Sequence, residues 1–525
     1  MSIAGELALT VREKNPKCKK TMSVIVIGAG MAGLKAASTL HKYGVKDIKV
    51  LESRDRIGGR LHTVTGFDGV RKYDLGASWH HDTLCNDLFF EECEVGGKFI
   101  FDDDFFIYID QERGRVDRDP EMGLEIIDRE ISKFADMEYY QKLGTPDVSF
   151  QELTLRYLYE KRQFLTDDQI RYSTQVARYL ELWHGLDWKL MSAKDTYFGH
   201  QGRNAMALYY GDVVERIAKT IPGECIELNA EVQGIKREKS KTVVTTKDGR
   251  QFSADYCIVT VPQSVLELSV KDETKKETGR IEFTPKLNAN IQAGFDLVHF
   301  GGMGKVIFEF DQTCWSKESS KLVTLASTSD KFAAEVRGSK SFEELRSSVN
   351  ASDAAQALEG RNCWNQPLYF INLAKTVGTA SFMMLMQSPL TEYIEAMGQD
   401  KEKVFEFFRP ALDAIMKNMQ GKPVVNGLAQ VPEGVDPSKT PVLRNVIVTS
   451  WTQDKYSRGA YTACRPGDDA LEMIVALEQG QSPSVRFAGE HTIVDGAGGV
   501  NGAWSSGLRE AEYVAEQLNL KRAEK

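Results

Sequence analysis

Three glycines near the start of the chain, Gly28, Gly30 and Gly33, form the pattern G-x-G-x-x-G. In such a turn the first glycine permits a tight bend, the second lets the backbone approach a pyrophosphate, and the third allows close helix packing. Residues 24–27 before the turn have the apolar pattern of a buried strand, and residues 31–43 after it have that of a helix. The N-terminus of that helix would face phosphate charge. The turn therefore predicts a dinucleotide-binding site.

Glu52 follows a second predicted strand, residues 48–51, and lies 24 residues after Gly28. A carboxylate at this place suits hydrogen bonds to the hydroxyl groups of a ribose. The glycine pattern alone is a weak signal. Strand, turn, helix, second strand and acidic residue occur here in the required order, which makes the interpretation much more specific.

Two further motifs extend this site. Arg56-Ile57-Gly58-Gly59-Arg60 follows Glu52 directly, and Gly489-Glu490 leads from a predicted strand toward a final helix over about 502–518. The set resembles the flavin amine oxidase family. The resemblance implies FAD as cofactor, with Arg60 at its pyrophosphate and the backbone of Val232 at its adenine. Trp451, Gly489 and Glu490 would complete the cofactor-binding residues.

Longer stretches are similar to flavin-containing polyamine oxidases of the fungal spermine oxidase type. They are residues 73–82, 182–188, 198–204, 443–451 and 456–461, and the resemblance runs from about 22 to 518. It implies an α/β fold of two discontinuous domains. A Rossmann-like FAD-binding domain would comprise 22–88, 205–294 and 440–520. A substrate-binding domain of mixed sheet and helices would comprise 89–204 and 295–439.

The resemblance implies the oxidation of a carbon–nitrogen bond, for which we expect His81 and Lys305 as catalytic residues. A polyamine is a cation at neutral pH, so the reacting nitrogen must lose a proton before a hydride leaves, and a titratable group is expected beside it. His81 would hydrogen-bond that nitrogen, and the neighbouring His80 is a weaker candidate. Lys305 lies among core-type residues of a predicted strand, where a lysine is costly unless it is paired or functional. The family places it near the flavin, where it assists the reaction with oxygen.

The resemblance also implies the substrate-binding residues. Trp79 and Tyr461 would form walls of a tunnel near the flavin, because aromatic faces attract a cationic amine. Trp183, His200 and Asn204 would hold a distal amine at the far end, and Asp103 would lie near the mouth. Monoamine oxidases attach FAD through a cysteine just before the tyrosine that matches Tyr461. That position here is Ala460, so we expect non-covalent FAD.

Composition excludes several other classes. The chain has 525 residues and a formal charge of −9, which disfavours nucleic-acid binding. Its eight cysteines form no C-x-x-C pair, so we expect reduced thiols, no metal site and a cytoplasmic location. No apolar run is long enough for a membrane helix. Residues 1–21 are predicted to be a disordered extension, and residues 339–366 look like a polar loop. We expect a polyamine and oxygen as partners, and a monomer or homodimer.

Two alternatives stay open. The nearest is an oxidase of another amine, such as an amino acid or a peptidyl lysine, although no cation for a substrate carboxylate is evident. The other is a non-catalytic binding protein on the same fold. Glu52, Arg60, Glu490 and Lys305 together argue against the second alternative.

Overall fold

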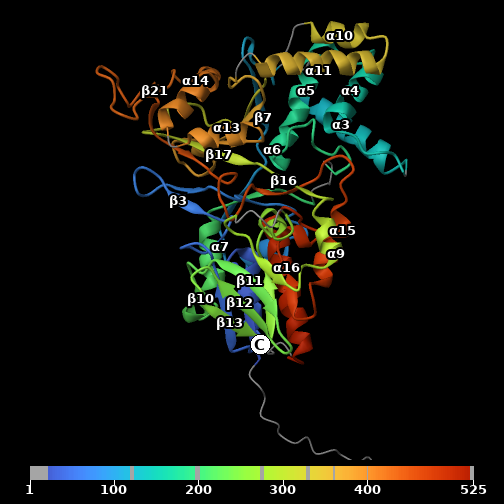
Figure 1. Ribbon diagram of the computed structural model, residues 1–525. Helices are drawn as coiled ribbons and strands as arrows, with labels where there is room; N and C mark the ends of the chain where they lie inside the picture. Colours follow the sequence, from blue (N-terminus) through green and yellow to red (C-terminus); the bar gives the residue numbers. More distant parts are fainter. Residues whose placement is uncertain are drawn as a thin grey trace, which may run out of the picture.

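A five-stranded parallel sheet forms the base of the molecule (Figure 1). The computed structural model describes residues 22–118, 123–142, 144–195, 201–271, 277–326, 331–358, 361–398 and 400–520. His200, which we predicted to bind substrate, and the predicted disordered segment 1–21 lie outside these residues. The strand order is β10 (Ile226–Glu227), β2 (Asp47–Leu51), β1 (Ser23–Ile27), β14 (Tyr256–Val259) and β24 (Val485–Phe487).

The first helix lies directly after the glycine turn. Helix α1 (Met31–Lys42) packs against α16 (Val500–Gln517), and the apolar residues of both share one core with the parallel sheet. The predicted strands 24–27 and 48–51 and the predicted helix 31–43 are thereby confirmed. On the other side of the sheet lies a four-stranded sheet of β13 (Gln251–Ala254), β12 (Thr242–Thr246), β11 (Val232–Arg237) and β15 (Glu282–Thr284).

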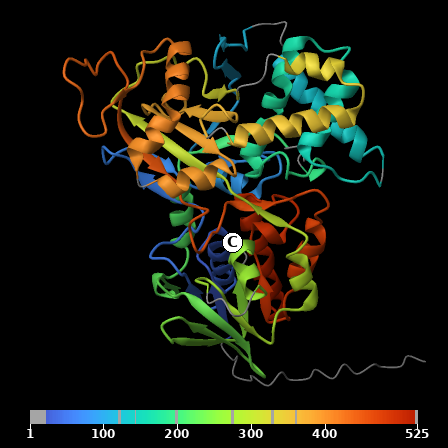
Figure 2. The same ribbon diagram turned by 45° about the horizontal axis from the view of Figure 1, so that its top comes forward.

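An eight-stranded mixed sheet dominates the upper part of the molecule (Figure 2). Its order is β21 (Val425–Asn426), β22 (Val442–Val448), β17 (Gly304–Phe310), β20 (Ser381–Met386), β19 (Leu368–Asn372), β18 (Lys321–Thr324), β7 (Phe106–Asp110) and β8 (Gly114–Arg115). Helices α13 (Leu390–Met397) and α14 (Lys401–Asn418) cover one face of it. Strand β22 falls in the segment from 440 onward that the sequence assigns to the FAD-binding domain, and it pairs with β17 in this sheet. The domain boundaries themselves stay a prediction.

Five helices form a separate cluster beside that sheet. They are α3 (Leu124–Tyr139), α4 (Phe150–Lys161), α5 (Asp167–Ala177), α10 (Phe332–Gly338) and α11 (Phe342–Leu358). Helix α11 corrects the prediction of a loop over 339–366 for residues 342–358. Leu345 and Val349, one helical turn apart, are buried in the core of this cluster. Tertiary packing of two apolar residues thus outweighs the polar character of the segment.

Short elements connect these layers and carry much of the site described below. Strands β5 (Trp79–His80) and β6 (Phe99–Phe101) pair with β9 (Ala205–Ala207), β16 (His299–Gly301) pairs with β23 (Tyr461–Ala463), and β3 (Thr63–Thr65) pairs with β4 (Lys72–Asp74). The remaining helices are α2 (Asp87–Glu94), α6 (Glu181–His184), α7 (Tyr210–Ala218), α8 (Gln263–Leu266), α9 (Ala289–Gly294), α12 (Leu373–Thr376) and α15 (Ala470–Gln479). Among the helices of the described residues, none is long and apolar enough to cross a membrane. The architecture is α/β, as predicted.

Candidate active site

One large cavity, of about 1330 Å³, collects residues from nearly the whole length of the chain. Its wall includes the glycine turn and the end of β2, the start of β17, β23, and the loop before α16. The main contributing stretches are 51–54, 58–61, 75–79, 230–232, 303–305, 460–464 and 493–501. Segments far apart in the sequence therefore meet at one place between the lower and upper sheets.

The glycine turn has the geometry that a bound pyrophosphate requires. A Cβ on Gly33 would lie 1.9 Å from the carbonyl oxygen of Gly28, so only glycine allows α1 to pack so close to β1. Gly28 has a φ of +104°, a conformation that side chains rarely adopt. A Cβ on Gly30, in contrast, would meet no protein atom within 4 Å, because this residue faces the cavity. Helix α1 begins after Gly30 without a side-chain cap, so its first amide groups suit an anion.

Glu52 is buried at the end of β2 and lines the cavity. Its Oε2 accepts a hydrogen bond from the backbone amide of Ala29 at 2.8 Å, and its Oε1 accepts one from the amide of Arg54 at 2.9 Å. The carboxylate therefore ties the glycine turn to the end of the second strand. This contact holds the turn in shape and keeps a negative group where a ribose is expected.

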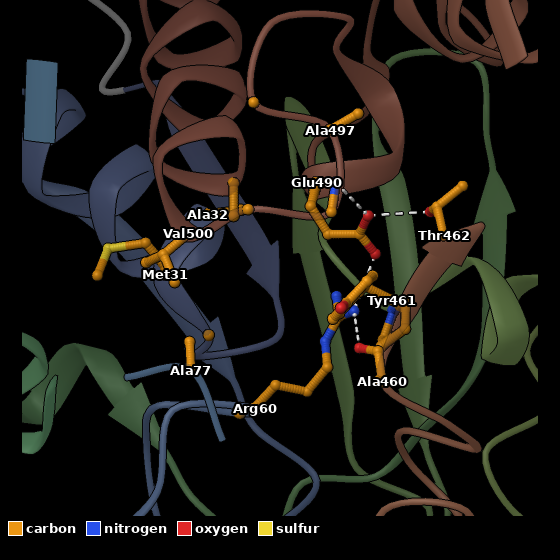
Figure 3. A pocket seen from close by; sticks show the side chains of 18 of the residues that line it. Met31, Ala32, Arg60, Ala77, Ala460, Tyr461, Thr462, Glu490, Ala497 and Val500 are labelled. Atoms are coloured by element: carbon orange, nitrogen blue, oxygen red, sulfur yellow. Dashed lines mark hydrogen bonds and ion pairs between the residues drawn. The ribbon is translucent and has the colours of Figure 1, made fainter. Parts of the chain in front are cut away.

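Arg60 and Glu490 form an ion pair inside the cavity, with 2.8 Å between Nη1 and Oε1 (Figure 3). The same guanidinium donates to the carbonyl of Ala460 at 2.7 Å, and Glu490 also accepts from the hydroxyl of Thr462 at 2.9 Å. Burial alone would raise the pKa of Glu490, but the charge and hydrogen bond of Arg60 help to hold that pKa below its usual value. This pair joins the segment after the glycine turn to β23, which carries Tyr461.

Val232, Trp451 and Gly489, the other predicted cofactor residues, also line the cavity. Val232 begins β11, and the indole Nε1 of Trp451 donates to the carbonyl of Leu75 at 2.8 Å. A Cβ on Gly489 would lie 2.6 Å from the ring of His491. The glycine cradle, the uncapped helix and the charged groups Arg60 and Glu52 together fit a dinucleotide such as FAD. No group of three or more potential metal ligands occurs within the described residues.

Lys305 is buried on β17 and lines the cavity. Alternation along the strand turns Lys305 away from Val306 and Phe308, which pack in the core of the eight-stranded sheet. Its Nζ donates to the carbonyl of Asp74 at 3.0 Å, to the carbonyl of Gly76, and to the hydroxyl of Ser78 at 2.6 Å. Burial lowers the pKa of Lys305 to about 8, although the charge of Asp74 opposes this shift. An ammonium with that pKa can change its charge near physiological pH.

His81 lines the cavity directly after β5, whereas His80 does not. The ring nitrogen Nδ1 of His81 is 2.9 Å from Oδ1 of Asn204, and its carbonyl accepts from the side chain of Asn86 at 2.7 Å. His80 instead contacts the hydroxyl of Tyr210, and burial lowers the pKa of His80 to about 4. Of the two neighbouring histidines, His81 is therefore the one that can meet a ligand in the cavity.

Three predicted aromatic residues, Trp79, Trp183 and Tyr461, lie in the cavity wall. The rings of Trp79 and Trp183 meet edge to face with 6.4 Å between their centroids. The hydroxyl of Tyr461 donates to the carbonyl of Trp183 and contacts the sulfur of Met303 at 3.3 Å. Burial raises the pKa of Tyr461, so this phenol stays neutral. Aromatic rings in such a wall can attract a cation and pack its methylene chain.

Two predicted substrate residues do not line the cavity. Asp103 does not line the cavity but forms an ion pair with Arg203, whose guanidinium lies 3.6 Å from the centroid of the Phe101 ring. The carboxylate of Asp103 is thus paired with the guanidinium of Arg203 at the protein surface. Asn204 is not at a far end of the cavity but behind His81, because the segment leading into β9 runs beside β5. Sequence similarity located both residues but could not show what each contacts.

The cavity also contains carboxylates that the sequence did not indicate. Asp87, Asp195 and Asp495 line it, and none of the three forms an ion pair in the part of the chain that the structure describes. Burial, together with the negative charge of Asp147, raises the pKa of Asp195. These residues come from separate loops and helix ends, so no local pattern could have predicted that they share one cavity.

The similarity to known proteins covers almost the whole chain. Residues 31–515 match the model of the family described as flavin containing amine oxidoreductase. A protein named corticosteroid-binding protein from Candida albicans is 31% identical over 95% of this chain and 97% of its own length. Polyamine oxidase 4 from Oryza sativa is 26% identical, over 99% and 93%. Lysine-specific histone demethylase 2 from Homo sapiens is 25% identical over 95% of this chain, but over 54% of its own length.

Proposed function

Because the chain belongs to the flavin-containing amine oxidoreductase family, and is thus an FAD-dependent amine oxidase, we propose that its substrate is a polyamine. Spermine is the first candidate, and N-acetylated polyamines are the second. From spermine, oxygen and water, the products are spermidine, an aminoaldehyde and hydrogen peroxide, since water hydrolyses the imine that oxidation leaves. When bound, FAD accepts a hydride from the carbon beside an amine nitrogen, and oxygen reoxidises it.

The observation that carries this proposal is the combination of aromatic walls and carboxylates in one cavity. Trp79, Trp183 and Tyr461 can pack the methylene groups of a polyamine and attract its charge. The carboxylates of Asp87, Asp195 and Asp495 can bind a second ammonium group of the same molecule. A small monoamine would use only the first of these features, whereas a long polycation uses both. Two relatives at 26% identity are named polyamine oxidases, which supports the same substrate class.

His81 would hold the reacting nitrogen and favour its neutral form. In the tautomer in which Nδ1 donates to Asn204, the other ring nitrogen presents a lone pair that can take a proton from an ammonium group. Asn86 holds the backbone of His81 at the same time. The histidine is thus fixed at its ring and at its carbonyl, which suits a group that must meet one nitrogen of a flexible substrate.

The cofactor contacts are part of the proposal. Gly28, Gly30 and Gly33 shape the pyrophosphate turn, and Glu52 meets the ribose. Val232 lies at the adenine, and Arg60, Trp451, Gly489 and Glu490 complete the FAD site. Lys305 assists the reaction with oxygen. These roles follow from the match between the family's residues and the cavity positions described above.

We further propose that FAD is bound without a covalent bond. Ala460 cannot form a thioether, although Cys85 and Cys464 lie elsewhere in the cavity wall. Acid precipitation of the purified protein should leave the yellow flavin in the supernatant. Flavin that stays with the precipitate would contradict the proposal, and mass spectrometry of peptides containing Cys85 or Cys464 would locate the attachment.

The substrate proposal is tested by measuring hydrogen peroxide release with spermine, spermidine, N-acetylated polyamines, benzylamine and a lysine-containing peptide. Spermine should give the highest kcat/KM. A preference for the peptide would favour the alternative of a peptidyl-lysine oxidase, and no reaction with any polyamine would reject the substrate class. Because the Candida relative is named a corticosteroid-binding protein, the assay is repeated with a corticosteroid as competitor. The corticosteroid should not inhibit peroxide release from spermine.

A charge-removing variant tests the carboxylates. Asp195→Asn should raise the KM for spermine about fivefold, since a solvent-accessible ion pair contributes at most about 1 kcal/mol net. Its KM for benzylamine, which has one nitrogen, should not change. Glu282→Gln, which removes an exposed charge on β15 outside the cavity, serves as control. An equal change for both substrates would show that Asp195 does not bind the second ammonium group.

A further inference from the structure

Glu395 is a buried carboxylate on α13 that accepts four hydrogen bonds from one short loop. Its Oε1 accepts from the hydroxyl of Thr449 at 2.8 Å and from the amide of Trp451 at 2.9 Å. Its Oε2 accepts from the amide of Thr452 at 2.8 Å and from the hydroxyl of that residue at 2.6 Å. Four donors use the full accepting capacity of a carboxylate, so the loop 449–452 is tied to this helix.

The loop 449–452 positions two residues whose side chains line the cavity, Lys305 and Trp451. Thr449 exchanges hydrogen bonds with Lys305, since its hydroxyl accepts from the amide of Lys305 at 2.9 Å and its own amide donates to the carbonyl of Lys305 at 3.0 Å. Trp451 lies two residues further on and lines the cavity. Glu395 therefore holds the backbone of Lys305, through Thr449, and the backbone of Trp451 directly.

Both side chains reach the same stretch of backbone, residues 74–78. Lys305 donates to the carbonyls of Asp74 and Gly76 and to the hydroxyl of Ser78, and Trp451 donates to the carbonyl of Leu75. Residues 75–78 all line the cavity. Glu395 itself does not line the cavity, but it fixes the backbone of Lys305 and of Trp451. The side chains of these two residues donate hydrogen bonds that hold one wall of the predicted FAD site.

We propose that Glu395 is a positioning residue for FAD. It acts through Thr449, Lys305 and Trp451 on the backbone wall 75–78, and it does not touch the cofactor. A carboxylate is needed because all four neighbours are donors. In either orientation, a glutamine would turn its NH₂ group toward one backbone N–H and one threonine hydroxyl. The hydrogen bond from the N–H is lost because both groups only donate, and the hydroxyl can accept only by reversing its present hydrogen bond. The inference rests on the proposed FAD site and is independent of the polyamine proposal, since its test measures FAD release rather than amine oxidation.

The test compares full-length Glu395→Gln with wild type, both purified with FAD. We expect FAD to leave the variant at least tenfold faster after dilution, as measured by the fluorescence of released FAD. We also expect a changed visible absorbance spectrum of the flavin that remains bound, because the wall 75–78 shifts. Glu392→Gln is the matched control, since Glu392 is exposed on the same helix and does not line the cavity. It should match wild type in both measurements.

A purely structural role would give a different result. In that case Glu395→Gln would lower the unfolding temperature of the protein with and without FAD by the same amount, and FAD release and flavin spectrum would stay those of wild type. That outcome overturns the proposal. If Glu395→Gln does not fold, Thr449→Val decides, because it removes only the hydroxyl between Glu395 and Lys305. A release of FAD about threefold faster supports the proposal, and an unchanged release rejects it.

Discussion

At the scale of single residues, the contact between His81 and Asn204 is the most specific feature of the candidate site. A histidine that can rotate presents either ring nitrogen to a ligand, whereas one held at Nδ1 presents the other nitrogen in a defined direction. Asn204 is therefore better understood as a partner of His81 than as a contact for a distant amine.

Asn204→Leu should lower kcat/KM for the amine substrate by about tenfold, because a typical hydrogen bond contributes roughly 1 kcal/mol and the ring also loses its orientation. Steady-state peroxide release measures this loss. FAD content serves as control and should equal that of wild type, since Asn204 does not line the cavity. Unchanged kcat/KM would show that His81 does not depend on this contact.

The lowered pKa of Lys305 predicts how flavin reoxidation depends on pH. Burial lowers the pKa of its ammonium group to about 8, so the positive charge is present below that pH and is lost above it. If the charged form assists oxygen, flavin reoxidation in wild type slows as the pH rises through about 8. Lys305→Met should reoxidise about tenfold or more slowly at pH 7 and show no such pH dependence. Stopped-flow traces in which flavin reduction slows more than reoxidation would refute this role.

At the scale of elements, the glycine turn contains one glycine that matters for cofactor binding and another that matters for folding. Gly30 has φ −75° and ψ −177°, which any residue can adopt, and the space beside it belongs to the cavity. Gly33 has no such space, because the carbonyl of Gly28 occupies it. Glycine is therefore required at position 30 to leave space for the cofactor, and at position 33 to let α1 pack against β1.

Gly30→Ala should fold like wild type but bind FAD at least tenfold more weakly, because its methyl group enters the space of the pyrophosphate. Gly33→Ala should lower the stability of the protein without FAD by about 2 kcal/mol or more, because β1 and α1 must move apart. Thermal unfolding of FAD-free protein and titration with FAD distinguish the two. Equal losses of stability in both variants would contradict this division of roles.

At the scale of the whole molecule, the cavity joins parts that the chain order keeps apart. Its wall takes residues from both large sheets and from loops between them. The ion pair of Arg60 with Glu490 joins residues 430 positions apart in the sequence, and that of Arg54 with Asp454 joins residues 400 positions apart. A cofactor in this cavity contacts several of these segments at once.

Removal of FAD should therefore lower the unfolding temperature. A ligand present at 1,000 times its dissociation constant stabilises the folded state by about 4 kcal/mol, which corresponds to roughly 4 °C for a chain of this length. Differential scanning fluorimetry of protein with and without added FAD measures the difference. A shift that does not grow with FAD concentration would show that FAD does not bind to the folded state.

Much of the cofactor site could be predicted because its signals are local. Gly28, Gly30, Gly33 and Glu52 lie within one strand–turn–helix–strand unit, and hydrogen-bonding and steric needs of a phosphate turn dictate their types. The resemblance located the residues that line the cavity further along the chain. The prediction of a loop over 339–366 was wrong for 342–358, because helix α11 depends on packing of Leu345 and Val349 against other helices.

The amino-acid sequence alone determined the dinucleotide turn and the family, and it indicated His81, Lys305 and the aromatic residues as candidates, because these depend on residue type and order. Only the tertiary structure decided which of them touch. It paired Asn204 with His81, placed Asp103 on Arg203, brought Asp195 into the cavity, and showed Glu395 behind Lys305 and Trp451. The physical reason is that such contacts arise between segments far apart in the chain, and their distances depend on how whole sheets and helices pack.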